Sequence, residues 1–265
     1  MRHFAETFIL PLIEANDYRR ICEIGANEGE NTEILLGLPS LSLTVIEPFP
    51  GNQLLAMCDR SERVSLCRGT SLEVLKQITC PFDCILIDGD HNWYTVYHEL
   101  KTIYDGKLLA YGGTVFFHDV AWPYGRRDMY YDPDKIPASY RKAYQQAGIE
   151  RGRSALSPNS DFNAKHWNAV SEGGERNGVL TAIEDFVNEY PGEFKFTCVR
   201  DEYGLGILTK RGDRDPALPY LSLLAKSKYV AFISNTRSGL RNNAPFLYRA
   251  LVKARTTWRR GLKLS

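Results

Sequence analysis

Five short apolar runs, separated by four stretches with helical periodicity, constrain the fold of this chain more than any other feature. The predicted strands cover 20–24, 43–47, 64–68, 84–88 and 114–118. Between them, helices are predicted at 31–36, 51–58, 71–77 and 93–104. Buried strands that alternate with helices require right-handed crossovers, which produce a parallel sheet covered on both faces. The pattern predicts an α/β fold whose ligands bind beyond the carboxyl ends of the strands.

The alternation stops after Val120 and returns near Gly178. Residues 121–177 are rich in Tyr, Arg, Asp, Pro and Gly with little periodicity, which is typical of a lid or a substrate-binding insertion. A helix is predicted at 178–190, and the β-rich runs FKFTCVRD and LGILTKR after it predict an antiparallel hairpin. The N-terminal stretch MRHFAETFILPLIEAND predicts an amphipathic helix.

Length and charge set the domain plan. The 265 residues, 43% of them hydrophobic, suit one large domain with an insertion, which we place at 1–211. The 33 basic and 32 acidic residues nearly balance, so nothing in the total charge indicates a nucleic-acid partner. After Asp215 there is no acidic residue, while ten Lys or Arg follow. We therefore predict a separate basic, helical C-terminal extension at 212–265.

The predicted helix of this extension carries an apolar face with Trp258, flanked by Lys and Arg. Such a helix either docks on the main domain or on a second subunit, or lies on an anionic membrane as a peripheral contact. We favour docking, and the sequence leaves a homo-oligomer open.

Cysteine usage and hydropathy indicate the compartment. The six cysteines lie mostly in or beside apolar runs, which favours reduced, buried thiols. No apolar run is long enough to span a membrane, and the N-terminal stretch does not read as a signal peptide. A cytoplasmic location is expected.

The stretch CEIGANEGENTEILL contains the end of the first predicted strand and the loop that follows it, with Gly25 and Gly29. A dinucleotide fingerprint counted from Gly25 would need glycines at 27 and 30, where Asn27 and Glu30 stand. The arrangement E-x-G-x-x-x-G instead resembles motif I of class I S-adenosylmethionine (SAM) methyltransferases. The second strand supports this resemblance, because Glu47 at its end lies 22 residues after Gly25.

The resemblance implies a SAM site. Glu47 would accept hydrogen bonds from the ribose hydroxyls, and Thr70 and Ser71 would contact the adenine end, although Ser71 could equally be a simple helix cap. The cofactor-binding residues that the resemblance implies are Glu23, Gly25, Asn27, Gly29, Glu47, Thr70, Ser71 and Asp88.

Polar groups also follow the fourth and fifth strands: Asp88, Asp90 and His91, then His118 and Asp119. The stretches IDGDHNWY and GGTVFFHDV resemble small-molecule and glycan O-methyltransferases, the macrocin- and catechol-O-methyltransferase-like branch. The implied fold is a Rossmann-like, mostly parallel seven-stranded sheet with an antiparallel final hairpin, plus the inserted lid and the helical tail.

The same resemblance implies a metal site, since catechol O-methyltransferase holds Mg²⁺ at these positions. Asp88, Asp90 and Asp119 would bind Mg²⁺ or Mn²⁺, with His118 or His91 left as the base, because imidazole suits Mg²⁺ poorly. We therefore expect the catalytic residues to be His118, His91 and Asp88. In the alternative, Asp88 caps the helix that starts near Trp93 and His91 stacks on adenine.

Aromatic rings and guanidinium groups dominate the start of the insertion, and they suit a polar ring such as a sugar or a phenol. The expected substrate residues are Trp122, Tyr124, Arg126, Arg127, Tyr130 and Tyr131. Alternatively, this segment packs on its own aromatic rings and pairs its arginines with Asp128 and Asp132.

These patterns predict a SAM-dependent methyltransferase that methylates a hydroxyl of a small metabolite or sugar, in natural-product or glycan biosynthesis. A metal-independent N-methyltransferase and a SAM-binding module without turnover are the alternatives. A binding module has no need for two acids and two histidines at the rim of the site.

Overall fold

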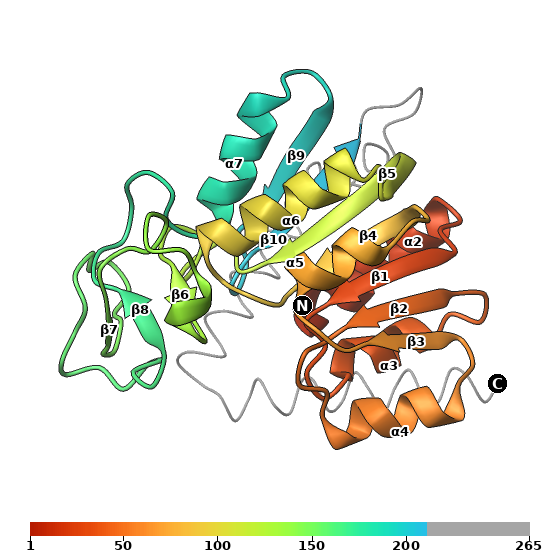
Figure 1. The fold of residues 1–265 in the computed structure, drawn as a ribbon, viewed down its shortest axis with the longest axis horizontal. Helices are drawn as coiled ribbons and strands as arrows, with labels where there is room; N and C mark the ends of the chain where they lie inside the picture. The colour runs from red at the N-terminus through yellow and green to blue at the C-terminus, as the bar shows by residue number, and fades with distance from the viewer. Residues whose placement is uncertain (211–265) are drawn as a thin grey trace. The chain divides into compact units, whose positions relative to one another are not determined.

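The computed structural model describes residues 1–210, so the predicted extension at 212–265 lies outside the described residues. Within the described residues, a seven-stranded sheet has the strand order β3-β2-β1-β4-β5-β10-β9 (Figure 1). The parallel strands are β1 (Arg20–Ile24), β2 (Ser42–Ile46), β3 (Val64–Cys67), β4 (Phe82–Ile87) and β5 (Leu109–His118). The antiparallel hairpin consists of β9 (Phe194–Val199) and β10 (Leu205–Lys210). The predicted α/β Rossmann-like fold is confirmed.

From β1 to β3 each new strand is added toward one edge of the sheet, and from β4 on the strands are added on the other side of β1. β1 and β4 therefore lie side by side, with Ile24 opposite Ile87. Both strands are buried over most of their length, since helices cover the two faces of the sheet. The loops at their carboxyl ends diverge, and this point of an α/β sheet is where ligands bind.

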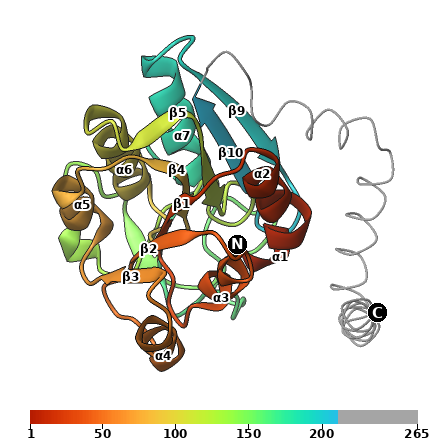
Figure 2. The ribbon, with the colours of Figure 1, turned by 90° about the vertical axis from the view of Figure 1, so that its right-hand side faces the viewer.

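Helices cover both faces of the sheet. The main helices are α3 (Glu30–Leu36), α4 (Asn52–Arg60), α5 (Ser71–Val74), α6 (Trp93–Asp105) and α7 (Val179–Glu189). Figure 2 shows α5, α6 and α7 on one side of the sheet and α3 with the N-terminal helices on the other. No helix within residues 1–210 combines the length and the hydropathy that crossing a bilayer requires.

The N-terminal segment is helical, as its amphipathic pattern predicts. It comprises α1 (Arg2–Phe4), a π-helical turn (Ala5–Ile9) and α2 (Leu10–Ala15). The wide turn ends two residues before Pro11, which has no backbone N–H to donate to the preceding turn. Phe4, Phe8 and Leu12 form its buried face.

One strand is longer than predicted. β5 begins at Leu109, five residues before the predicted strand, and its pairing with β4 is irregular between Phe82 and Cys84. Gly112 and Gly113 lie in this early part, and glycines normally indicate a turn rather than a strand. All six cysteines are free thiols, but only Cys22 and Cys84 are buried and Cys80 is exposed, so the predicted burial holds for two of them.

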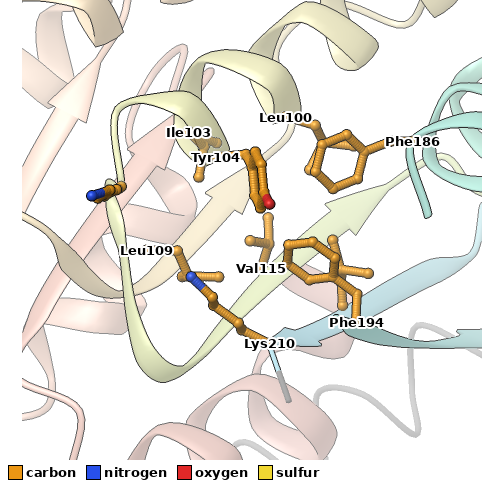
Figure 3. Close-up of a pocket in the computed structure, with 10 residues that line it drawn as sticks. Leu100, Ile103, Tyr104, Leu109, Val115, Phe186, Phe194 and Lys210 are labelled. Carbon is orange, nitrogen blue, oxygen red and sulfur yellow. The ribbon is translucent and has the colours of Figure 1, made fainter. Parts of the chain in front are cut away.

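Close packing fills the space between α6, α7, β5 and the hairpin. Leu100, Phe186 and Phe194 point toward one another there, with Tyr104 and Val115 beside them (Figure 3). The remaining interior volume is about 10 Å³, barely room for one water molecule. This pocket is part of the core and does not hold a ligand.

The insertion has secondary structure that its sequence does not predict. A second, antiparallel sheet with the order β6-β8-β7 joins β6 (Met129–Tyr130), β7 (Tyr144–Gln146) and β8 (Trp167–Ala169), green in Figure 1. A 3₁₀ turn covers Pro133–Lys135. Strands of two or three residues are too short for an alternating pattern to be recognised.

Asp128 joins this insertion to the main domain. Its buried carboxylate accepts the backbone N–H of Trp93 at 2.7 Å and of Gly178 at 2.6 Å, together with the Tyr130 hydroxyl at 2.8 Å. Trp93 and Gly178 stand at the N-terminal ends of α6 and α7. One carboxylate therefore holds the insertion against the start of two helices.

Candidate active site

The loop after β1 has a backbone that suits glycine. Gly25, Asn27 and Gly29 have positive φ angles of 80°, 49° and 85°. A Cβ atom on Gly25 would lie 2.4 Å from the Cα of Gly89 in the loop after β4. The first glycine of the predicted SAM loop is thus required by the close approach of the two loops that flank the site.

Glu47 lies where the sequence predicts a ribose ligand, yet its carboxylate already holds protein groups. Oε2 accepts the backbone N–H of Ala26 at 3.0 Å and of Asn27 at 2.8 Å, and Oε1 accepts that of Phe49 at 2.9 Å. A carboxylate accepts about four hydrogen bonds, so one acceptor position remains for a ligand. Glu47 therefore fixes the shape of the loop after β1, and its predicted contact with ribose stays a prediction.

Glu23 is buried, and both of its oxygens bind α3. They accept the Asn31 side-chain amide at 3.0 Å and the Thr32 hydroxyl at 2.6 Å. Burial raises the pKa of Glu23 to about 7, against the effect of these hydrogen bonds. These contacts give Glu23 a role in attaching α3 to the sheet.

Thr70 and Ser71 begin α5. Thr70, not Ser71, is the N-cap, and it forms a capping box with Glu73, whose carboxylate accepts the Thr70 hydroxyl at 2.7 Å. The predicted alternative of a cap by Ser71 is therefore wrong by one residue. Ser71 is buried, and its predicted contact with adenine stays a prediction.

Four side chains converge at the carboxyl ends of β4 and β5. The Nε2 atom of His91 lies 2.7 Å from Asp119 Oδ2, and the Nδ1 atom of His118 lies 2.8 Å from the same oxygen. Asp88 Oδ1 lies 3.0 Å from His118 Nδ1 and 3.8 Å from His91 Nε2. Each of the four residues offers one atom to a group whose members lie within 4.8 Å of one another.

Backbone geometry places this cluster. Asp88 directly follows β4, and His118 is the last residue of β5. Asp119 adopts a positive φ of 58°, which is uncommon for a residue with a side chain and often marks a functional position. The carbonyl of His91 accepts the backbone N–H of Met129 at 3.0 Å, so the insertion holds the loop that carries His91.

The four groups of the cluster control one another's charge. Burial lowers the pKa of His118, but the Asp88 charge and hydrogen bonds with Asp119 and Asp88 outweigh it and raise this pKa to about 9. Burial also opposes a charged His91, but Asp119 holds its pKa well above the usual value. The histidines outweigh burial at Asp88 and Asp119 and hold the pKa of both carboxyls below their usual range. At neutral pH the cluster pairs two imidazolium ions with two carboxylates.

Of the predicted metal set of Asp88, Asp90 and Asp119, Asp88 and Asp119 belong to the converging group. Asp90 accepts the Thr95 hydroxyl at 2.9 Å and is not part of the converging group. A Mg²⁺ site built on three carboxylates does not fit, because imidazole nitrogens take the remaining positions. The alternative in which Asp88 caps α6 is also wrong, since the cap is Asn92, whose side chain accepts the Thr95 N–H.

Aromatic rings surround the cluster, and two of them were not expected from the sequence. Phe4 of α1 lies 6.2 Å from the His118 ring, and Tyr203, in the turn between β9 and β10, lies 5.9 Å from it. The N-terminal ammonium of Met1 pairs with Asp88 Oδ2 at 2.9 Å. No local pattern reveals these contacts, because they join segments far apart in the chain.

The predicted substrate residues divide into two groups. Tyr124 and Tyr130 are buried, whereas Tyr131 is 57% exposed. Tyr124 and Tyr131 lie 5.6 Å and 6.1 Å from the His91 ring, so both border the cluster. Trp122 stacks on Phe162 at 5.1 Å, on the side of the insertion. Tyr130 bonds to Asp128 and thus supports the insertion.

The two arginines bind protein groups. Arg126 forms a forked ion pair with Glu184 of α7 at 2.6 and 2.7 Å. Arg127 is buried and donates to the carbonyls of Ala169 and Ser154. Their predicted role in gripping a substrate is not supported by these contacts, and the predicted pairing with Asp128 and Asp132 is not what forms.

Residues 22–120 match the family model described as a methyltransferase domain. No curated protein matches the chain. Among solved structures, the chain is similar to a methyltransferase from Podospora anserina with bound S-adenosylhomocysteine, with 16% identity, 77% of each chain covered and a TM-score of 0.48. It is also similar to 1,6-didemethyltoxoflavin-N1-methyltransferase from Burkholderia thailandensis, with 13% identity, 77% and 76% of the two chains covered and a TM-score of 0.47.

Proposed function

We propose that this chain, whose residues 22–120 match the model of a methyltransferase domain, is a class I SAM-dependent methyltransferase that methylates a hydroxyl group of a small polar metabolite or sugar. The pairing of His91 and His118 with Asp119 carries this proposal. A hydroxyl is a weak nucleophile near neutral pH and needs a proton acceptor, whereas an amine needs less activation. An amine acceptor would have less need of the two imidazoles than a hydroxyl has.

The cofactor is proposed to lie along the loop from Gly25 to Gly29, with its sulfonium methyl group toward Asp88. Two observations support this placement. The loop after β1 and the loop after β4 touch at Gly25 and Gly89. At this point of the sheet the order in which strands are added reverses. Glu47 also retains one acceptor position for a ribose hydroxyl.

His91 is our first choice as proton acceptor, with His118 as its partner. Its ring borders Tyr124 and Tyr131 of the insertion, the side from which an acceptor would enter. In the reaction, the sulfur–methyl bond breaks as the oxygen–methyl bond forms, and the hydroxyl proton passes to the imidazole. Because Asp119 holds the imidazole protonated at neutral pH, His91 must release its proton before each transfer.

The acceptor is proposed to contact Tyr131 and Trp122. Tyr131 is the exposed aromatic ring beside the cluster. Trp122 lies in the same insertion, where its ring stacks on Phe162 and the Arg151 guanidinium lies over it. Alignment of the acceptor with the methyl group supplies much of the rate in such a displacement, so these rings set substrate choice and orientation.

The first test measures SAM binding by titration calorimetry, followed by mass spectrometry of products from matched hydroxyl and amine acceptors. His91→Gln and His118→Gln are each expected to lower kcat by about 100-fold or more, with SAM affinity retained, because a positioned base contributes this much. His98→Gln is the matched control, since His98 bonds to the Tyr94 carbonyl on α6, away from the cluster.

Two results would contradict the proposal. Absence of a binding heat with SAM would remove the cofactor assignment. Methylation of amines alone, with kcat unchanged in both histidine variants, would establish the metal-independent N-methyltransferase instead.

A further inference from the structure

Three side chains of the insertion form a stack at its surface. The ring of Phe162 stacks on the Trp122 ring at 5.1 Å, with 28° between the two planes. The guanidinium carbon of Arg151 lies over the same indole, 4.9 Å from the ring centroid. A guanidinium that rests on an aromatic ring is attracted by the ring and keeps its N–H donors available along its own edges. The stack therefore presents a preorganised cation.

Arg151 has no counterion in the part of the chain that the structure describes. Arg126, Arg127 and Arg141 of the same insertion lie 2.6 to 3.9 Å from protein carboxylates. Arg151 is exposed, and no carboxylate within residues 1–210 pairs with it. Its N–H donors are therefore available to an anionic ligand, with which a guanidinium forms strong, charge-assisted hydrogen bonds.

The stack belongs to the side of the insertion that borders His91. Trp122 packs against Tyr124 and Met129 in one apolar cluster. The Tyr124 ring lies 5.6 Å from the His91 ring, and the Met129 N–H donates to the His91 carbonyl at 3.0 Å. The Arg151 guanidinium and the proposed proton acceptor thus contact the same group of aromatic and apolar side chains.

One segment of the insertion, 162–166, holds these rings together. Its first residue is the phenylalanine of the stack. The Asn163 side-chain amide donates to the Tyr124 hydroxyl at 2.7 Å, and the His166 ring lies 5.9 Å from the exposed Tyr131 ring. The same segment therefore supports the stack and both tyrosine rings that border the proton acceptor.

We propose that the methyl acceptor carries an anionic group, a carboxylate or a phosphate, which the Arg151 guanidinium binds while the acceptor hydroxyl lies at His91. This inference rests on the proposed function, because it names the class of substrate that the function would use. The guanidinium fork matches both anionic groups, since each offers it two oxygens. Arg151 takes the part that the sequence assigns to Arg126 and Arg127, whose guanidinium groups bind protein oxygens.

The test titrates the full chain, with and without S-adenosylhomocysteine, with three related probes: glucose, glucuronate and glucose 6-phosphate. At least one of the two anions is expected to bind about tenfold or more tightly than glucose, because hydrogen bonds to charged groups contribute this much. The anion that binds more tightly identifies the group as a carboxylate or a phosphate. Glucose binding as tightly as both anions, or no binding of either anion, overturns the inference.

Matched variants separate anion binding from packing. Arg151→Met keeps an apolar cover on Trp122 and removes the charge. It is expected to abolish the advantage of the anions over glucose, and to raise KM for an anionic acceptor more than it lowers kcat. Arg176→Met is the control, since Arg176 rests on the Trp93 ring at 5.3 Å, where Trp93 stacks on Tyr97 of α6. With both variants folded by circular dichroism, an equal loss in the two, or no loss in Arg151→Met, contradicts the inference.

The two proposals fail separately. If the anions bind through Arg151 but the chain methylates no hydroxyl, the proposed function fails and the anion site stands. If hydroxyl acceptors without an anionic group are methylated as efficiently as anionic ones, the proposed function stands and the inference about Arg151 fails.

Discussion

At the scale of single residues, Gly25 shows how one position serves both the fold and the site. Its φ of 80° is open to most residues only with strain, and a Cβ there would meet the Gly89 backbone at 2.4 Å. Backbone atoms cannot rotate away as a side chain can, so the loops after β1 and β4 would have to separate. The cofactor is proposed to lie between these loops.

We therefore expect Gly25→Ala to lose about 2 kcal/mol more stability than Gly152→Ala, together with most SAM affinity. Gly152 is the matched control, since its φ is 83° and a Cβ there would meet nothing within 4 Å. Urea unfolding and SAM calorimetry provide the measurements. Equal losses of stability in the two variants would show that the close approach to Gly89 does not affect the free energy of unfolding.

Residue types alone identified the cluster's two histidines and its two carboxylates, because charged groups at the ends of buried strands are rare without a functional role. They could not separate Asp90 from its neighbours. Its hydrogen bond with Thr95 turns it to α6, and that bond depends on where the helix starts. Glu47 and the two arginines likewise have protein partners that no spacing in the sequence reveals.

At the scale of elements, the attachment of the insertion depends on one carboxylate. Asp128 bonds to the first turns of both α6 and α7 and to Tyr130 of β6. Burial raises the pKa of Asp128 to about 6, although hydrogen bonds from Gly178 and Trp93 act against this shift. Without the Asp128 carboxylate, the backbone N–H groups of Trp93 and Gly178 and the Tyr130 hydroxyl would be buried without this acceptor.

Asp128→Ala is therefore expected to destabilise the protein by about 3 kcal/mol and to expose 121–177 to limited proteolysis. Asp134→Ala is the control within the same insertion. The Asp134 side chain is 93% exposed and pairs with Arg141 at 3.1 Å, an interaction expected to contribute under about 1 kcal/mol. Similar melting temperatures and cleavage rates for the two variants would refute the role of Asp128.

Periodicity predicted nearly every element of the main sheet, since each strand and helix there is long enough to show its pattern. β1 begins and ends where predicted, and α6 and α7 differ by a residue at their ends. The insertion's strands escaped prediction because two or three residues carry no period. Tertiary hydrogen bonds, such as that from Ala169 to the Asp128 carbonyl, define them instead.

At the scale of the whole molecule, a buried acid outside the cluster links stability to pH. Glu99 of α6 is fully buried, and neither carboxylate oxygen has a hydrogen-bond partner among the described residues. Burial raises the pKa of Glu99 from 4.5 to about 8, despite the nearby Ser71 hydroxyl. The folded protein thus binds one proton more than the unfolded chain between these values, and stability falls as pH rises through them.

Glu99→Gln removes this titration. We expect the wild type to lose stability relative to the variant by on the order of 5 kcal/mol between pH 4.5 and about 8, the ordinary and the raised pKa. Urea unfolding at several pH values measures the difference, with Glu175→Gln at an exposed position as control. Parallel stability curves for wild type and Glu99→Gln would rule out a neutral, buried Glu99.

The sequence by itself determined the parallel sheet, its final hairpin, the glycine-containing loop after β1 and the two strand ends where the charged groups gather. These features follow from local patterns: apolar runs that bury, glycines where the backbone turns sharply, and charges at strand ends. Only the tertiary structure decided which of those charges face one another. Four of them meet because β4 and β5 are adjacent, while Asp90 turns to α6 and Phe4 and Tyr203 arrive from the two ends of the domain. Contacts between segments distant in sequence depend on packing, which no local pattern contains.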